Sequence, residues 1–577
     1  LPTYPSQASR SCHCQLPITA ASKVGGAMRK LIAAALVLVL TGCAQIPTQI
    51  DVKSGPEIAN EIEQEFAYYT PSGPVTGADQ QQIVSGFLAA GTGPQGDYSV
   101  AREFLSKDFA QRWKPDAAVL IRSGAPQFRE ASSGLQFVNL NITARLDEHG
   151  RYQDSLTAED VSLRFQLVRE DGEWRIASAP DLTVVTAPVF SVVFQPYSVY
   201  FFDSQQRRLV ADSRWFPSRA STGTRLINAM LAGPSRWMED AVQTAIPAGT
   251  KLTIDAVRVQ DGVAQVDFDS SALSADAIGR RLMLAQIRAT LLQLSGVNEV
   301  ALFVNSSPQD IVPASVTPSR NGAEGIAMIE GVVRLGAGVQ QPLPGTAMFV
   351  QNNQPSHFAT NAAADKVAFV TTTGVYLVGG TGISSRTQRI SEDSDVAALA
   401  FDPDGLLWVF PRRSGAELQV FDDSTLVKSI ILPALGERKA AEFSSDGARL
   451  GVLLQAEGEA RLEIFSLTKD VRLMPDRLYP GVVTDTAIGT PISFTWQNQA
   501  TVRVLELSLS GATTLSDYPL AGPRSQLATP PVKGRKIVSG STEFATYMLG
   551  ETQEIWALTG GSWRRVVASA LDITNSR

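Results

Sequence analysis

The sequence predicts a multidomain chain in which two α+β domains precede an all-β propeller of five or six blades. Three observations lead to this prediction. The chain has 577 residues, more than a single hydrophobic core usually serves. Within 76–325, helical and strand-like patterns follow one another twice, which indicates two mixed domains. From 326 to 577, strand-like segments repeat at about 40 residues, the length of a four-stranded propeller blade.

The composition is that of an ordinary globular protein. Hydrophobic residues make up 44% of the chain and charged residues 19%, and the formal net charge is -7. A nucleic-acid-binding protein would carry a basic stripe or a high pI, so the composition argues against nucleic acid as a partner.

A short apolar run near the start of the chain predicts export. Arg29 and Lys30 precede ten apolar residues at 31–40, the basic front and apolar middle of a signal peptide. The run is too short for a transmembrane helix, which needs about 20 apolar residues. The four residues at its exit resemble the bacterial lipobox: Leu40, Thr41, Gly42 and Cys43. An uncleaved anchor with an incidental cysteine is the alternative.

The lipobox resemblance implies that Cys43 becomes an N-palmitoyl, S-diacylglycerol cysteine after cleavage. We therefore expect a signal peptide at 28–42, a membrane tether at 43–75, and an upstream extension at 1–27 from a start assigned too early. Cys12, His13 and Cys14 in that extension are too few ligands for a structural zinc site. With Cys43 lipidated, the mature chain forms no internal disulfide and must fold on its hydrophobic cores.

The first folded region, 76–190, opens with helices and continues with strands. An apolar face around Phe87 predicts one helix, and Asp97 is typical of the N-cap of a second helix over 98–113. Alternating strands around Asp171-Gly172 then predict a hairpin. Helices followed by a curled sheet resemble the cystatin-like or NTF2-like folds. His149 falls in a loop, and we favour a docking or spacer role over a ligand-holding cone.

The second folded region, 191–325, repeats the mixed pattern. Strands at 199–203 and 207–216 lead to a helix that Thr222 can cap, and strands at 251–259 and 263–269 flank an Asp-Gly turn. A helix and a closing strand follow. The segments MLAGP, AIPAGTKL, DGVAQVDF and QIRATLLQL are similar, in order, to the GerMN domain of bacterial cell-surface proteins, which implies no catalytic residues.

Several acidic residues of this region are candidates for a metal or acid/base site. Asp267 and Asp269 share one strand face, with Asp276 near the next helix. They alternate with Val266 and Phe268, which favours the solvated face of a half-buried strand. The same interpretation applies to Glu239, Asp240 and Glu299.

The last region, 326–577, is repetitive. Phe358, Phe401 and Phe443 stand 43 and 42 residues apart. Asp404-Gly405 and Asp446-Gly447 supply tight turns into apolar strands, similar to the turns of TolB-like and WD40-like blades. A β-sandwich of irregular hairpins is the alternative.

The sequence predicts that the chain is not an enzyme and uses no metal or cofactor. The two histidines after the lipobox fall in different domains, with His357 expected at a blade edge, and no serine-hydrolase elbow or zinc-protease motif is present. Asp402 and Asp404 are too few carboxylates for a calcium shell unless backbone oxygens and waters complete it. A glycosidase activity that uses two carboxylates remains an alternative, since such pairs have no fixed spacing in the sequence.

Taken together, the segments DYSVAREFLSKDFAQRW, NAMLAGPS, SALSADAIGRRLMLAQIRATL and FDPDG resemble the LpqB-type lipoproteins of actinobacteria. The resemblance implies a lipid-anchored protein on the extracytoplasmic face of the cell membrane. Its implied partner is the extracytoplasmic domain of an MtrAB-like sensor histidine kinase, in cell-envelope and cell-division signalling. The alternatives are binding of cell-wall glycan or muropeptide, and a cell-wall hydrolase.

Overall fold

The structure is a computed structural model that describes residues 71–576 except 318, 320–323, 336–339, 380–385, 485–488 and 541–545. The predicted signal peptide, the lipobox with Cys43 and nearly all of the predicted tether lie outside the described residues. Among the described residues, no helix is long and apolar enough to cross a bilayer.

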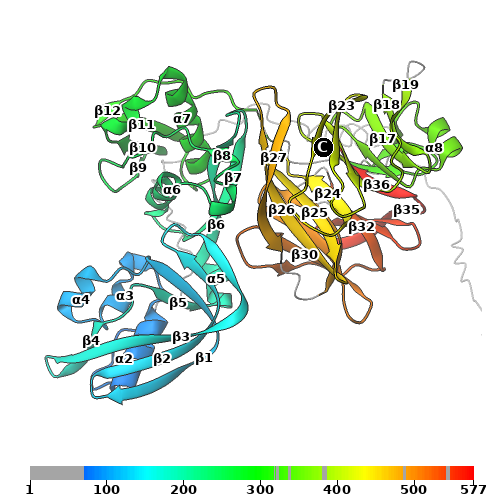
Figure 1. The fold of residues 1–577 in the computed structure, drawn as a ribbon. Helices are drawn as coiled ribbons and strands as arrows, with labels where there is room; N and C mark the ends of the chain where they lie inside the picture. Colours follow the sequence, from blue (N-terminus) through cyan, green and yellow to red (C-terminus); the bar gives the residue numbers. More distant parts are fainter. Residues whose placement is uncertain are drawn as a thin grey trace, which may run out of the picture. The chain divides into compact units, whose positions relative to one another are not determined.

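The N-terminal domain is α+β, as predicted (Figure 1). Its sheet has the order β4-β3-β2-β1-β5, antiparallel throughout except that β5 runs parallel to β1. The helices pack on this sheet around a core that includes Phe87, Trp113 and Phe165. The elements are α2 (Gln80–Ala90), α3 (Ser99–Arg102), α4 (Lys107–Arg112), β1 (Ala118–Ser132), β2 (Leu135–Asp147), β3 (Tyr152–Glu170), β4 (Glu173–Ser178) and β5 (Thr183–Thr186).

The single helix predicted over 98–113 is wrong, because the chain breaks it into α3 and α4. Asp97 has a positive φ of 55° and does not cap a helix; Ser106 caps α4, accepting from the Phe109 N–H. Strand pairing explains the break. Ser106 donates its backbone N–H to the carbonyl of Ile176 in β4, and Ile176 donates to Phe104, so these residues leave the helical path.

The middle domain is a second α+β unit. One sheet has the order β12-β11-β10-β9 and the other β7-β6-β8. The predicted boundary at 190/191 falls inside α5. The elements are α5 (Ala187–Val193), β6 (Phe194–Asp203), β7 (Leu209–Pro217), α6 (Thr222–Leu231), β8 (Val242–Gln243), β9 (Arg258–Gln260), β10 (Val263–Phe268), α7 (Ala277–Leu291), β11 (Glu299–Val304) and β12 (Ser307–Pro308).

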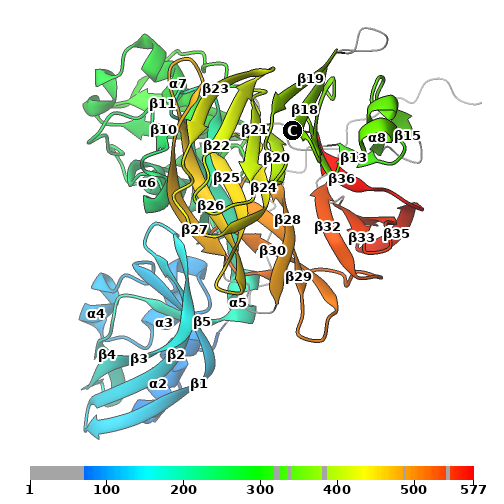
Figure 2. The ribbon, with the colours of Figure 1, turned by 45° about the vertical axis from the view of Figure 1, so that its right-hand side comes forward.

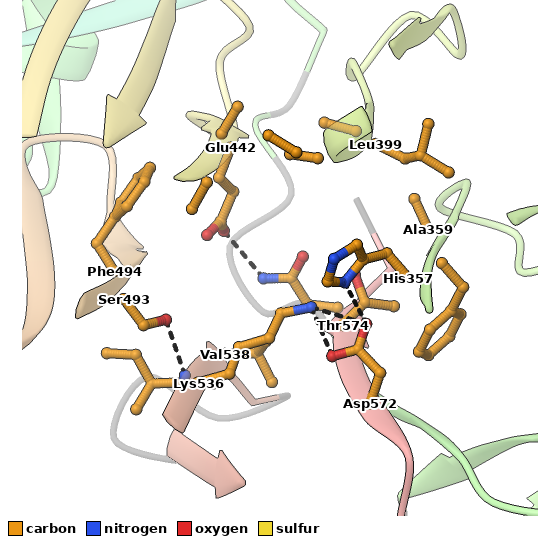
Figure 3. Close-up of a pocket in the computed structure, with 18 of the residues that line it drawn as sticks. His357, Ala359, Leu399, Glu442, Ser493, Phe494, Lys536, Val538, Asp572 and Thr574 are labelled. Carbon is orange, nitrogen blue, oxygen red and sulfur yellow. Dashed lines mark hydrogen bonds and ion pairs between the residues drawn. The ribbon is translucent and has the colours of Figure 1, made fainter. Parts of the chain in front are cut away.

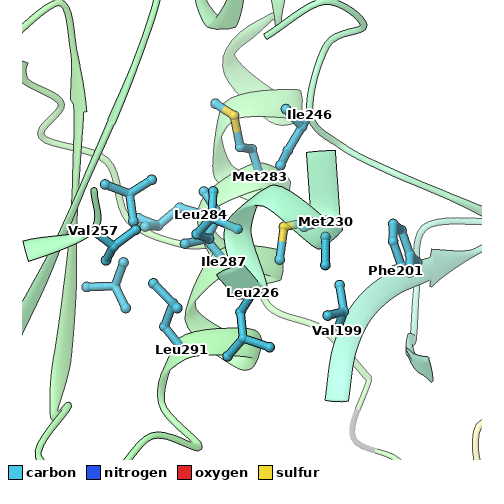
Figure 4. Packing of buried hydrophobic residues seen from close by; sticks show 14 of the residues in the cluster. Val199, Phe201, Leu226, Met230, Ile246, Val257, Met283, Leu284, Ile287 and Leu291 are labelled. Carbon is cyan, nitrogen blue, oxygen red and sulfur yellow. The ribbon is translucent and has the colours of Figure 1, made fainter. Parts of the chain in front are cut away.

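The core of the middle domain lies between α6, α7 and strand β6. Figure 4 shows Leu226 and Met230 of α6 beside Ile287 of α7 and Val199 of β6, and all four side chains are buried. This packing accounts for the amphipathic patterns that predicted both helices.

Two details of the middle domain correct the sequence prediction. The strand expected over 251–259 is reduced to β9, although Asp261 and Gly262 form the expected turn, with φ of 52° and 77°. Thr222 is the first helical residue rather than the cap. Its hydroxyl donates to the Pro217 carbonyl and accepts from the Arg219 N–H, which fixes the chain just before the helix.

The C-terminal domain is a propeller with six four-stranded blades among the described residues, so the range of five or six narrows to six. Figure 2 shows inner strands of the blades, among them β20, β24, β28, β32 and β36, around a common centre. The helix α8 (Ala347–Asn353) precedes the second blade. Blades two to six are β16 (His357–Thr360), β17 (Lys366–Thr371), β18 (Gly374–Gly379), β19 (Arg386–Ser391); β20 (Val396–Phe401), β21 (Leu407–Pro411), β22 (Leu418–Asp422), β23 (Thr425–Ile430); β24 (Glu437–Phe443), β25 (Arg449–Ala456), β26 (Glu459–Lys469), β27 (Pro475–Thr484); β28 (Thr490–Asn498), β29 (Thr501–Leu507), β30 (Thr513–Pro519), β31 (Ser525–Gln526); and β32 (Gly534–Ser539), β33 (Thr546–Gly550), β34 (Ile555–Thr559), β35 (Ser562–Val567).

The first blade closes the ring, because it combines strands from both ends of the domain. β13 (Gly325–Met328), β14 (Val332–Leu335) and β15 (Gln340–Pro342) form its outer part, and β36 (Asp572–Asn575) is its innermost strand. β36 pairs antiparallel with β13, and Figure 2 shows the two side by side. Closure of this kind leaves no long open sheet edge between the first and last blades.

The repeat is shifted by two residues from the predicted alignment in the second blade. Phe401 and Phe443 each end an inner strand, whereas Phe358 is the second residue of β16. Thr360 holds the position in β16 that Phe401 holds in β20. The residue after each of them, Asn361 and Asp402, donates its backbone N–H across the turn that follows the strand.

Candidate functional site in the propeller channel

The central channel of the propeller holds a cavity lined by both polar and apolar residues. Its volume is about 350 Å³, and its lining comes from the innermost strand of every blade. The inner strands run in one direction: Thr360 and Ser576 form a parallel bridge, and Ile537 and Ser539 donate their N–H groups to the hydroxyls of Ser493 and Thr495. One end of the channel is therefore built from the first residues of several strands.

At that end, three ionisable side chains from different strands converge (Figure 3). The Lys536 ammonium lies 2.9 and 3.1 Å from the two carboxylate oxygens of Asp572, and His357 Nδ1 lies 3.7 Å from Asp572 Oδ2. The Asp572 side chain is 4% exposed. Burial alone would raise the pKa of Asp572, but the charges of Lys536 and His357 outweigh it and hold the pKa below its ordinary value.

Further along the channel, a second carboxylate is held by neutral donors. Glu442 Oε1 accepts from Asn575 Nδ2 at 2.9 Å and from the Thr495 hydroxyl at 3.1 Å. Asn575 also contacts the Ser539 hydroxyl at 3.1 Å. These bonds join four blades around one carboxylate, and Figure 3 shows Glu442 facing the centre of the channel.

A second charged cluster lies at the turn between β20 and β21. This turn carries Asp402 and Asp404, the two carboxylates considered from the sequence as calcium ligands. Here a lysine takes the cation's place: Lys469 Nζ lies 2.9 Å from Asp402 and 2.6 Å from Asp404, and Arg208 lies 2.7 Å from Asp404. Burial alone would raise the pKa of Asp404, but Arg208 and Lys469 lower it to about 2. Burial alone would lower the pKa of Lys469, but Asp402 and Asp404 raise it.

The acidic candidates of the middle domain have structural roles. Asp267 accepts from the Ser306 N–H, Asp269 caps the short helix after β10, and Asp276 caps α7 through the Gly279 N–H. Each carboxylate thus accepts from a backbone donor, a role that the predicted solvated strand face did not include.

The two histidines differ in their surroundings. His149 lies in the β2–β3 turn beside Glu148, as the loop prediction expected. His357 begins β16, an edge strand of its blade, in agreement with the predicted blade edge. This edge is the innermost one and lines the channel, where His357 faces Asp572, a partner that the sequence did not predict.

Sequence reasoning missed the channel residues, since Lys536 and Asp572 carry no motif. Lys536 lies outside the segments around Phe358, Phe401 and Phe443 that revealed the repeat, and Asp572 belongs to a strand that pairs with residues about 250 positions earlier. The available signal was positional. A charged side chain near the start of an inner blade strand faces the channel end.

Three family models match the chain in succession. They are described as the N-terminal domain of lipoprotein LpqB (residues 73–191), sporulation and spore germination (198–310), and the lipoprotein LpqB beta-propeller domain (330–572). The chain belongs to the LpqB family. The order of the matches agrees with the three domains of the structure, and the middle match covers the predicted GerMN domain.

Curated relatives carry the same family name. A protein named Lipoprotein LpqB from Cutibacterium acnes is 29% identical over 285 residues, which cover 48% of this chain and 47% of the relative. The alignment thus spans about half of that relative's length. The LpqB protein of Streptomyces avermitilis is 25% identical over 506 residues, covering 78% of this chain and 81% of the relative.

Among solved structures, the first GerMN domain of the sporulation protein GerM from Bacillus subtilis is similar to part of this LpqB-family chain. It is 22% identical, with a TM-score of 0.18, and the match covers 22% of this chain and 92% of that domain.

Proposed function

We propose that this chain is a lipoprotein anchored on the extracytoplasmic face of the cell membrane, where it modulates a two-component sensor kinase of the MtrAB kind. The observation that supports the proposal is the succession of family matches over 73–572, two of them to LpqB domains, behind a segment at 40–43 that resembles a lipobox. The matched relatives are named lipoproteins, and anchoring by several acyl chains is stable where one chain alone is marginal.

Anchoring gives a physical reason why a weak contact is sufficient. The predicted tether at 43–75 would keep the folded domains within a short distance of the membrane surface. A partner in the same membrane then meets them at a high effective concentration, so a modest affinity still yields high occupancy. The kinase domain on the same face of the membrane is such a partner.

The contacts of the charged channel residues favour binding over chemistry. Lys536 and Asp572 form an ion pair that His357 faces, and Glu442 is held by hydroxyl and amide donors. Groups held in this way keep a fixed shape and charge, which suits recognition of a partner or ligand.

The anchor is tested with Cys43→Ser. We expect metabolic labelling with a fatty acid to be lost, and phosphorylation of the response regulator to change as it does when the gene is deleted. Fusing the Cys43→Ser chain to an unrelated membrane anchor is the matched control and should restore signalling. Labelling that persists in Cys43→Ser would contradict the anchor assignment.

The partner is tested by titrating residues 44–577, without lipid, against the purified extracytoplasmic domain of the kinase. We expect a dissociation constant in the micromolar range, on the order of 10–100 μM. Absence of binding together with unchanged phosphorylation after gene deletion would refute the kinase proposal.

A further inference from the structure

The channel end carries more hydrogen-bond donors than the described contacts use. Lys439, Arg535 and Lys536 all line it. In the described structure, the contacts of these side chains are Lys439 with Glu437 at 2.9 Å, Arg535 with the Leu571 carbonyl at 2.7 Å, and Lys536 with Asp572. An ammonium has three donors and a guanidinium five, so donor capacity remains at each.

The two carboxylates that line the channel are already engaged. Asp572 accepts from Lys536 and faces His357, and Glu442 accepts from Asn575 and Thr495. A cationic ligand would have to displace these partners and would meet three fixed cations. An anionic ligand would need no displacement, because it would accept from donors that the protein leaves unused.

The walls of the channel limit the size and character of the ligand. Ala359, Leu399, Phe494 and Val538 supply apolar surface beside the charged end, as Figure 3 shows. A volume of about 350 Å³ is at the low end of ligand pockets, which range over roughly 300–1,000 Å³. The cavity therefore suits a small molecule with an apolar part.

We propose that the channel binds a small organic anion, whose carboxylate or phosphate is held by Lys439, Arg535 and Lys536 and whose apolar part lies against Leu399 and Phe494. The carboxyl end of a short peptide has this chemistry. The inference does not rest on the kinase proposal, because it follows from the channel residues alone.

The experiment measures binding to the full chain, purified with its lipid in detergent, by calorimetry or ligand-observed NMR. The probes are N-acetyl-alanyl-alanine, the same dipeptide as its carboxyl-terminal amide, and inorganic phosphate. We expect the acid to bind at least about tenfold more tightly than the amide. Phosphate that competes with the acid identifies a shared anion site, and phosphate binding without acid binding assigns the site to phosphates.

Variants test the assigned residues. In Lys439→Met/Arg535→Met, both side chains lie at the channel end outside the core, and we expect binding to weaken at least about fivefold. Lys536→Met should weaken it at least as much, provided that its circular dichroism is unchanged. Lys428→Met, on the outer strand β23, is the matched control and should change binding less than about twofold.

Three results would overturn the proposal. They are equal binding of the acid and the amide, no binding of acid or phosphate at about 20 mM, and unchanged affinity in the folded double variant.

Discussion

Replacing Lys469, the buried lysine at the end of β26 that contacts the β20–β21 turn, should cost measurable stability and reveal its coupling to Asp402. The Lys469 side chain is 9% exposed and the Asp402 side chain is not exposed at all. Lys469→Met keeps most of the side-chain length and removes the charge, so Asp402 is left as a buried carboxylate without its cation.

The structure sets the expected size of this effect. Removing one partner of a buried ion pair costs about 3–5 kcal/mol. Arg208 still pairs with Asp404, and Asp402 Oδ1 still accepts the N–H groups of Asp404 and Leu406 at 3.0 Å, so we expect the lower end. A loss of about 3 kcal/mol corresponds to a fall of about 6–12 °C in Tm for a domain of this size.

A double-mutant cycle isolates the interaction between the two residues. Asp402→Asn alone should cost about 1–2 kcal/mol, because the amide oxygen still accepts both backbone N–H groups. The double variant Asp402→Asn/Lys469→Met leaves no unpaired charge, so we expect its loss to stay near 3 kcal/mol and the coupling to reach at least about 1 kcal/mol.

The assay is denaturant unfolding of residues 44–577, followed by the fluorescence of buried tryptophans such as Trp408 and Trp496. Lys428→Met is the control, because its partly exposed side chain lies 3.9 Å from Asp476, and it should change stability by less than about 0.5 kcal/mol. Additive losses in the cycle, within about 0.5 kcal/mol, would refute the reasoning.

Three further predictions concern the propeller. The pKa of Asp404 is lowered to about 2 in the folded state, which adds about 2 kcal/mol to the free energy of unfolding above pH 4. This contribution is lost as the pH falls toward 2, so Asp404→Asn should flatten the curve of stability against pH in this range. An unchanged slope in the variant would contradict the prediction. Ile573→Ala removes a buried side chain from the core of the first blade and should lower the free energy of unfolding by about 2–5 kcal/mol in denaturant unfolding. Leu571→Ala, at a half-exposed position, is the control and should lower it by less than about 0.5 kcal/mol. Similar losses of stability in the two variants would count against ring closure by β36. A chelator should leave Tm unchanged, because Lys469 occupies the turn that could hold calcium, and a clear fall in calorimetry would show a bound ion.

The parts of the fold that the sequence predicts are those with local signals. The Asp-Gly turns at Asp404 and Asp446 and the apolar strands after them indicate blades, and the amphipathic patterns of α6 and α7 indicate the middle domain. The blade count stayed open because the first blade joins β13 to β36, a pairing that no local period reveals.

The errors arise where tertiary contacts override local preference. Residues 98–113 have a continuous apolar face, yet pairing of Ser106 with Ile176 breaks the helix. Phe358 was aligned with Phe401, whereas Thr360 holds the equivalent position in the structure, and a shift of two residues changes a side chain's position along an inner strand. The channel site depends on such positions, so the family resemblance was predictable but the site was not.

Closure by β36 makes assembly of the domain depend on its last strand. Joining residues 325 and 575 closes a loop of about 250 residues, which costs about 5 kcal/mol of chain entropy that the packing of one four-residue strand must offset. A chain that crosses a membrane from its amino-terminal end would release this strand last. This strand also carries Asp572, which pairs with Lys536, and Asn575, which donates to Glu442. A clipped or incompletely translocated chain would therefore have five blades in place and no channel site.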